Sequence, residues 1–418
     1  MQLRITKARW AQAAAILAVA AYARQGHAQV AEFDTSHAIF YEAPTRTHMF
    51  VYSPSATVQV SPWSWLDVRG GWEADVVSGA SVKTKAGPAY GATHSPDVVT
   101  TASVHDVRNL GRGEVAIKGD TTSLTAGYAY GTEHDYRSNS LHVDARTDVF
   151  QHNTQFELSY ARNFDSVCDR VQSANASGPT QWIALENSTD CFTDAAGRTT
   201  HAIGIDAYEV SWAQSWTPVV ATQLTYTAEL VDGFQSDPYR SVILGEGILA
   251  QEHEPNERAR EAVTARVAWY IRPLKGALRL SVRGYHDTWA IGSGSVELEA
   301  EKSLGQDVRV MARGRFYKQS GAVFWSDDYT GGNPPLGPRG QYWTGDRELS
   351  PFSSWLAGIR VVWTLAPANG RLLGVLESLK LAGSFNLSGY SYDEYTLAGI
   401  PVSDALTYLG ALSLEAAF

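Results

Sequence analysis

The residues best suited to do chemistry in this 418-residue chain are charged residues that recur at every second position. In the stretch 307–317, Arg309, Arg313 and Arg315 occupy one parity, and valine, alanine, glycine and phenylalanine occupy most of the other. Side chains two residues apart point to the same face of a β-strand, so the stretch predicts a strand with an arginine face and an apolar face. A row of guanidinium groups attracts anions, which predicts an anion-favouring surface.

Neighbouring stretches of the same kind extend the charged face. A glutamate row in the stretch 293–304 lies between two arginine rows, and opposite charges on adjacent strands can pair across the ladder. The residues predicted to share this face are Arg266, Arg279, Arg283, Glu297, Glu299, Glu301, Arg309, Arg313, Arg315 and Arg360.

The elements that must position these residues are strands of about ten residues with alternating apolar and polar positions, repeated along the chain. Short connections alternate with longer ones, including about 79–111, 164–201, 232–259 and 320–351. This asymmetry is typical of an all-β fold, the up-and-down antiparallel transmembrane barrel of the bacterial outer membrane, with short periplasmic turns and long extracellular loops.

The strand count follows from the same alternation. It gives 15 strands from about His48 to Phe418, and a barrel with both ends in the periplasm needs an even number. A further strand at Ser36–Ala43 makes 16, and 14 is the alternative. A 16-stranded barrel is too wide for side chains alone to fill, so we expect the charged face to line an open lumen. The competing interpretation is a small lumen filled by mutually paired charges.

Both ends of the chain carry export signals. Residues 1–28 have an n-region with Arg4, Lys7 and Arg9, then an alanine-rich core and a Gly-His-Ala cleavage site, which predicts a secretory signal peptide. The remaining 29–418 is then one barrel domain. Without the four basic residues of that peptide the formal charge of −10 becomes −14, which makes nucleic acid an unsuitable partner. The last strand ends on Phe418 and resembles the C-terminal insertion signal of outer-membrane barrels, which implies the barrel-assembly machinery as a partner.

Aromatic residues support the same orientation. Five tryptophans lie within a few residues of short turns, as expected for an interfacial girdle, namely Trp63, Trp65, Trp216, Trp269 and Trp363.

The long loops carry acidic residues, among them Asp327 and Asp328 in the loop 320–351. General porins resemble this arrangement, in which an acidic loop folded into the pore faces a basic wall. An inward fold and a surface position for the loop 320–351 are equally compatible with its sequence. Another loop contains both cysteines of the chain, Cys168 and Cys191, and in an exported protein we expect them to form a disulfide that staples the loop.

A family resemblance rests on small motifs. Tyr-Arg-Ser follows an acidic residue directly at Tyr136–Ser138 and after one proline at Tyr239–Ser241, and the stretch 315–329 reads RFYKQSGAVFWSDDY. With these features the chain resembles a family of uncharacterised bacterial outer-membrane proteins, a domain of unknown function that covers nearly the whole mature chain. The resemblance implies a barrel and its location and carries no activity.

Signals for enzymes, metals and cofactors are weak. Ser140 and His142 lie near each other without an evident base-to-nucleophile arrangement, and neither Gly-x-Ser-x-Gly nor His-Glu-x-x-His occurs. Acidic residues beside His134 and His253 are expected to be solvated. We therefore predict no enzymatic activity, no metal and no cofactor.

The predicted function is a passive pore or diffusion facilitator in the bacterial outer membrane for small polar, and in particular anionic, solutes. The alternative is a non-conducting barrel that displays its loops to an envelope or extracellular partner. Expected partners are outer-membrane lipid, lipopolysaccharide and small polar solutes, and a homo-oligomer is left open.

Overall fold

The structure is a computed structural model of the chain. It describes residues 30–43, 49–78, 98–100, 105–170, 191–192, 198–238, 240–244, 248–326, 329, 341–367, 370–392, 396–397, 400–401 and 404–418. The predicted signal peptide and the loop acids Asp327 and Asp328 lie outside these ranges.

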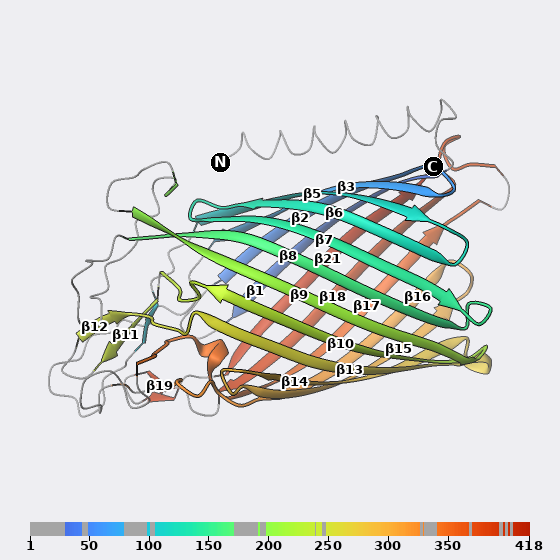
Figure 1. The fold of residues 1–418 in the computed structure, drawn as a ribbon. Helices are drawn as coiled ribbons and strands as arrows, with labels where there is room; N and C mark the ends of the chain where they lie inside the picture. Colours follow the sequence, from blue (N-terminus) through green and yellow to red (C-terminus); the bar gives the residue numbers. More distant parts are fainter. Residues whose placement is uncertain are drawn as a thin grey trace.

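Sixteen of the described strands form one closed antiparallel barrel (Figure 1). In chain order they are β1 (Val30–Ala43), β2 (Met49–Trp63), β3 (Leu66–Ser78), β5 (His105–Lys118), β6 (Thr122–Thr132), β7 (Tyr136–Val149), β8 (Thr154–Arg170), β9 (Arg198–Thr217), β10 (Val220–Gly233), β13 (Glu257–Ile271), β14 (Gly276–Asp287), β15 (Gly292–Leu304), β16 (Val308–Gln319), β17 (Phe352–Leu365), β18 (Ser378–Tyr392) and β21 (Ala405–Ala417).

The barrel closes between its first and last strands. β1 pairs with β21 from Glu32 opposite Ala417 to Ala43 opposite Leu406, and β1 also pairs with β2. Closure leaves no unpaired strand edge, which a membrane interior requires because it offers backbone groups no other partner. The strand predicted at Ser36–Ala43 is therefore confirmed and begins earlier, and the count of 16 is confirmed over 14.

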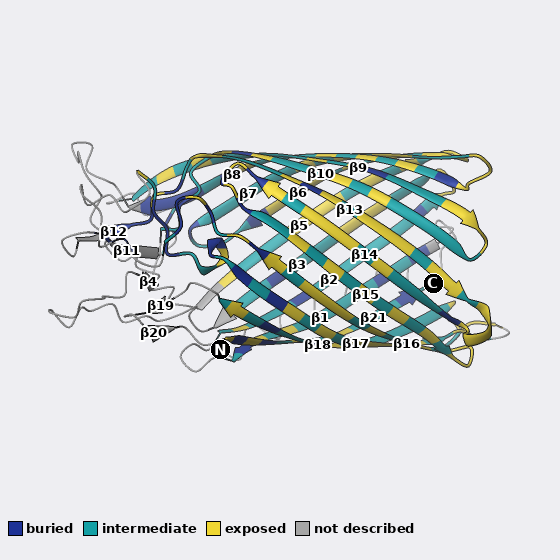
Figure 2. Cartoon of the chain, turned by 90° about the horizontal axis from the view of Figure 1, so that it is seen from below, coloured by how far each residue is buried: buried dark blue, intermediate teal, exposed yellow. Residues whose placement is uncertain are grey.

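The outward parity of the strands carries the apolar side chains. Leu298 and Phe316 are 53% and 56% exposed, as expected for side chains whose solvent is lipid, and Figure 2 shows exposed residues running along the outside of the barrel. The five predicted girdle tryptophans are all among the exposed large residues near the short turns, and Trp63 stacks on Trp65 with ring centroids 5.5 Å apart. An apolar exterior on a closed antiparallel barrel is the architecture of an outer-membrane protein.

The two ends of the barrel differ as predicted. One end has tight turns, including the 3-10 helix η2 (Arg272–Leu274). The other carries the long connections, with the short strands β4 (Val98–Thr100), β11 (Arg240–Leu244) and β12 (Ile248–Gln251) in one sheet, a β19 (Thr396–Leu397) and β20 (Ile400–Pro401) pair, and the 3-10 helix η3 (Arg347–Leu349). Among the described residues, no helix is long and apolar enough to cross a membrane.

The predicted limits of several loops are wrong by a few residues. The loop predicted at 164–201 is shorter, because β8 and β9 stay paired as far as Arg170 opposite Arg198. The loop predicted at 79–111 ends earlier, because β5 begins at His105. Backbone pairing continues beyond the apolar band, and the alternation that reveals a strand is lost where both faces become wet.

Candidate functional site: the charged lumen

All ten predicted charged residues lie on the inward parity of β13 to β17, which form one continuous wall of the barrel. The register aligns Arg279 with Glu299, and Glu299 with Arg313, across three neighbouring strands. We call the inward side chains of β13–β17 the basic wall. Arg258, Arg260 and Asp287, which were not singled out from the sequence, also belong to it.

The glutamate row pairs with only part of the basic wall. Arg279 donates to Glu299 Oε1 at 2.7 Å and to Glu301 Oε2 at 3.0 Å, and Arg309 lies 3.8 Å from Glu301. Glu297 and Arg315 are opposite each other in register, yet they form no ion pair. The acids of this wall are therefore partly compensated by its arginines.

Five arginines of the basic wall have no acidic partner among the described residues. Two of them bond to hydroxyls instead: Arg266 donates to Ser281 Oγ at 3.1 Å, and Arg283 to Thr264 Oγ1 at 3.3 Å. The five are Arg266, Arg283, Arg313, Arg315 and Arg360. Charges that are not neutralised internally remain available to mobile anions.

Arg313 shows how the wall is shaped. Its Nε and Nη2 donate to Asn386 Oδ1 at 3.0 and 2.8 Å, although Asn386 lies two strands away on β18. The side chain crosses over Gly358, where an added Cβ would lie 3.2 Å from the Arg313 side chain and 2.2 Å from Asn386 Oδ1. Only glycine leaves room for this crossing.

Two hollows lie beside Arg313 and Arg360 on the inner surface. One has a volume of about 320 Å³ and includes both arginines, Ser384 and Ser413 in its lining. The other, about 250 Å³, lies nearer the periplasmic end and is lined by Arg309, Arg360 and Lys380 among others. The small residues of β18, β21 and β1 make these spaces, so the basic wall faces room for a solute rather than packed side chains.

The loop 320–351 is attached to the inner surface of the mouth. Arg347 donates to both carboxylate oxygens of Glu42 at 2.6 and 2.8 Å, and Glu42, on the inward parity of β1, is only 1% exposed. Burial alone would lower the pKa of Arg347, but its hydrogen bonds to Glu42 raise that pKa above the ordinary value. The guanidinium therefore stays charged, and the tie is an ion pair.

Further ties connect the loop to the opposite side of the barrel. Thr344 Oγ1 lies 2.8 Å from carboxylate oxygens of both Glu252 and Glu254, and Trp343 Nε1 donates to Gln251 O at 2.7 Å. This partner segment leads directly into β13. Around the closed barrel, β10 lies eight strands from β1, and β10 pairs with β13. The contacts of the loop with Glu42 and with this segment are therefore on opposite sides of the barrel.

The described parts of the loop therefore reach across the mouth rather than away from it. Two buried apolar clusters hold them there: one contains Trp289, Phe324 and Trp325, and the other contains Leu244 and Tyr329. We call the described residues 320–326, 329 and 341–351 the cap. The sequence was compatible with both an inward and a surface position of the loop 320–351. No pattern in the sequence indicated the contact between Glu42 and Arg347.

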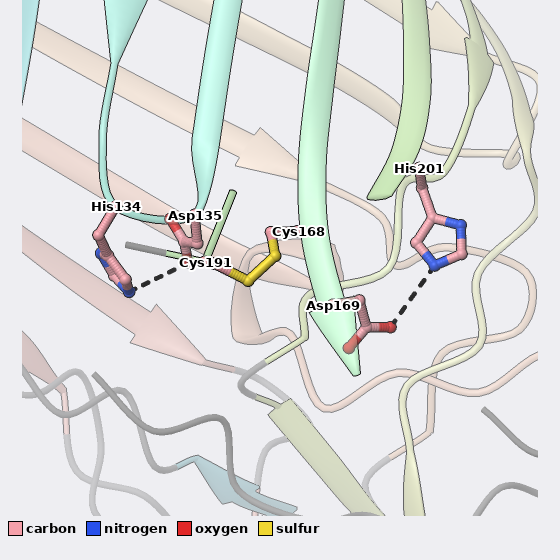
Figure 3. Close-up of a disulfide and its surroundings, with 6 residues drawn as sticks. All are labelled: His134, Asp135, Cys168, Asp169, Cys191 and His201. Carbon is pink, nitrogen blue, oxygen red and sulfur yellow. Dashed lines mark ion pairs between the residues drawn. A yellow bond between two sulfur atoms is a disulfide. The ribbon is translucent and has the colours of Figure 1, made fainter. Parts of the chain in front are cut away.

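The predicted disulfide joins Cys168 to Cys191, with Cα atoms 6.0 Å apart (Figure 3). Backbone bonds hold the same region against the β6–β7 connection: Cys168 N donates to Asp135 O and Cys191 N donates to His134 O. Figure 3 also shows Asp169 next to His201, 3.8 Å apart. The disulfide thus fixes the outer end of β8, outside the apolar band.

A second charged wall was missed by the sequence analysis. The inward parity of β7–β10 is mainly acidic, and Arg146 is its one described inward arginine. We call the inward side chains of these strands the acidic wall; its acids are Asp144, Asp148, Glu157, Asp165, Asp169, Glu209 and Glu229. The alternation could have revealed this wall, because each acid occupies the inward parity of its strand. The acids are spread over four strands, however, and no single strand carries a row of them.

The expectation that the acids beside His134 and His253 are solvated is wrong, because Asp135, Glu252 and Glu254 are buried where the long connections pack at the outer end of the barrel. Ser140 and His142 share a face of β7, but His142 Nε2 lies near Glu114 and Asp144, 3.9 Å from each, and no hydrogen bond joins it to Ser140. In the part of the chain that the structure describes, no three His, Cys, Asp or Glu residues gather closely enough to hold a metal ion.

Solved structures with a similar course of the chain are barrels of low sequence identity. They include a bacterial polysaccharide outer membrane secretin (9% identity, 92% of this chain and 97% of that chain, TM-score 0.47) and Pseudomonas aeruginosa OprD (7%, 93% and 95%, 0.40). OmpT of Vibrio cholerae is another (10%, 93% and 97%, 0.38). Among curated proteins, none matches this chain.

The family resemblance seen in the sequence is supported by a match to a protein-family model. A family model matches residues 8–378, which is most of the chain. Together with the closed sixteen-stranded barrel, this match makes the conclusion plain: the chain is an outer-membrane β-barrel that belongs to the family described as "Protein of unknown function (DUF3570)".

Proposed function

We propose that this barrel is a passive pore for small polar solutes and that anions are favoured along the basic wall. The observation that carries the proposal is the excess of unpaired arginine on that wall, beside hollows of about 320 and 250 Å³. An arginine paired with a neighbouring carboxylate only cross-links the wall, whereas one without an acidic partner attracts anions from solution. The cap narrows the entrance and excludes large solutes.

The deciding experiment is a single-channel recording of the purified barrel in a planar bilayer, with a potassium chloride gradient. A pore gives stepwise conductance. A preference for anions shifts the reversal potential from zero toward the equilibrium potential of chloride. Absence of conductance in protein whose barrel is folded, as judged by heat-modifiable migration in gels, would refute the pore.

A second candidate is a non-conducting barrel that presents its outer surface to an envelope or extracellular partner. The observation in its favour is the organised outer end, where the cap is held by buried aromatic residues and β8 by the Cys168–Cys191 disulfide. For this candidate, removal of residues 168–191 abolishes partner capture while gel migration of the folded barrel stays unchanged.

A further inference from the structure

A groove on the inner surface lies where the acidic wall meets the basic wall. It has a volume of about 540 Å³ and extends across β7, β8, β9, β10, β13 and β14. The titratable side chains of its lining that have the inward parity, apart from tyrosine, are His142, Asp144, Glu209, Glu229, Arg260 and Arg283. This groove is separate from the two hollows beside Arg313 and Arg360, which lie on other strands.

Small side chains form the floor of the groove, and charges stand at its two ends. The cross-strand register gives one continuous row, in which Asp144 pairs with Ser159, Ser159 with Glu209, Glu209 with Thr227, Thr227 with Ala262 and Ala262 with Tyr285. Alanines from the next row, including Ala161 and Ala207, deepen the floor. A solute can therefore lie along the row, in contact with both ends.

The two ends carry opposite charges, and at each end one charged side chain has no ion-pair partner among the described residues. Glu229 and Arg260 in the middle neutralise each other at 2.6 Å. In contrast, neither Glu209 on β9 nor Arg283 on β14 has an ion-pair partner among the described residues. The groove thus has an anionic end at Glu209 and Asp144 and a cationic end at Arg283.

We propose that the groove binds dipolar solutes that carry an ammonium group at one end and a carboxylate at the other, as unmodified short peptides do. Three ladder spacings separate β9 from β14, about 14 Å at the backbone, and inward-pointing side chains on a concave wall shorten this gap. An extended tripeptide spans about 10 Å. The ammonium would lie at Glu209 and the carboxylate at Arg283.

This inference rests on the proposed pore function, and its test uses one set of recordings with three probes. Triglycine has both charges, N-acetyltriglycine has only the carboxylate, and triglycine amide has only the ammonium. The measured quantity is the probe concentration that produces half of the maximal reduction in single-channel current. Triglycine should reach half-saturation at a concentration about threefold to fivefold lower than either capped peptide, the scale of one solvent-exposed ion pair.

Two variants assign the ends. Glu209→Gln should remove the advantage of triglycine over N-acetyltriglycine, and Arg283→Gln should remove its advantage over triglycine amide. Glu377→Gln and Arg371→Gln are matched controls, because these residues form an exposed pair in the β17–β18 turn at 3.1 Å, far along the chain from the groove. Both controls should keep the wild-type order of the probes.

The outcomes separate the two proposals. A folded barrel without conductance refutes the pore, and the groove falls with it. A conducting barrel that responds equally to all three peptides overturns the groove alone, and this comparison needs only the wild-type protein. Loss of the triglycine advantage in the control variants, or its persistence in both groove variants, also overturns the assignment.

Discussion

The basic wall of β13–β17 and the acidic wall of β7–β10 are built on the same plan, with charged side chains among the inward-facing residues that occupy every second position of a strand. They differ in how acids and bases are distributed. The basic wall gathers its three glutamates on β15 alone, so their arginine partners come only from β14 and β16. The acidic wall spreads its acids over four strands, and several of them bond to neutral groups, as Asp148 does with Gln155 at 2.9 Å.

The comparison shows that net charge and available charge are different properties of a lumen. Glu297 and Arg315 stand opposite each other without pairing, while Arg313 turns away from Glu299 to reach Asn386. The basic wall therefore keeps more free cationic charge than a count of its acids and bases predicts. Each wall, and the cap above both, can be changed separately, with the unchanged wall as the reference.

The largest effect is expected when the free charge of the basic wall is removed. In Arg313→Gln/Arg315→Gln/Arg360→Gln, the chloride-to-potassium permeability ratio should fall by about tenfold, because three of the five arginines without an acidic partner no longer attract anions. The reversal potential in a salt gradient measures this ratio. An unchanged reversal potential in a conducting triple variant contradicts the assignment of these arginines to the conduction path.

The next largest effect concerns the cap. Arg347→Ala leaves the buried carboxylate of Glu42 without its partner, and loss of one member of a buried pair costs about 3–5 kcal/mol. We expect the cap to detach, with faster proteolysis near residue 347 and single-channel conductance raised by about twofold. Arg371→Ala serves as the control, because the Arg371–Glu377 pair is about half exposed.

An intermediate effect is expected on the acidic wall. Asp144→Asn/Glu157→Gln should raise the chloride-to-potassium permeability ratio by about twofold, opposite in sign to the basic-wall variant and smaller, since these acids are fewer. The same bilayer recordings measure it. A shift toward potassium would mean that the two walls do not act on one common path.

A smaller effect is expected from a single methyl group. Gly358→Ala should displace Arg313 from Asn386, because the new Cβ would overlap Asn386 Oδ1. The permeability ratio should change by less than about twofold, as the charge remains but its position shifts. Gly314→Ala is the matched control on the outward face of β16, where the nearest atom to the new Cβ is 3.8 Å away. Equal effects of both substitutions would argue against the crossing over Gly358.

The smallest effect on conduction is expected from the disulfide. Cys168→Ser/Cys191→Ser should leave conductance and ion preference unchanged, because the bond lies beyond the apolar band at the outer end of β8. Protease resistance of that end should fall, as the bond no longer restrains the β8–β9 connection. A changed permeability ratio would link this region to the lumen.

The sequence by itself predicted 16 strands, with 14 as the alternative, and determined the inward and outward faces and the disulfide partners. Alternation is a local property, since successive side chains of a strand must point to opposite faces, so residues such as Arg309 and Glu299 were assigned correctly from position alone. The cysteines needed only an export context and a lone pair.

Only the tertiary structure decided which charges meet. The pairing of Arg279 with Glu299 and Glu301, the crossing of Arg313 to Asn386 and the tie between Arg347 and Glu42 depend on strand register, on barrel closure and on a loop that returns across the mouth. Glu42 and Arg347 are 305 positions apart in the chain. No local pattern encodes such a contact, because side-chain periodicity determines a face and only closure of the barrel determines what that face meets.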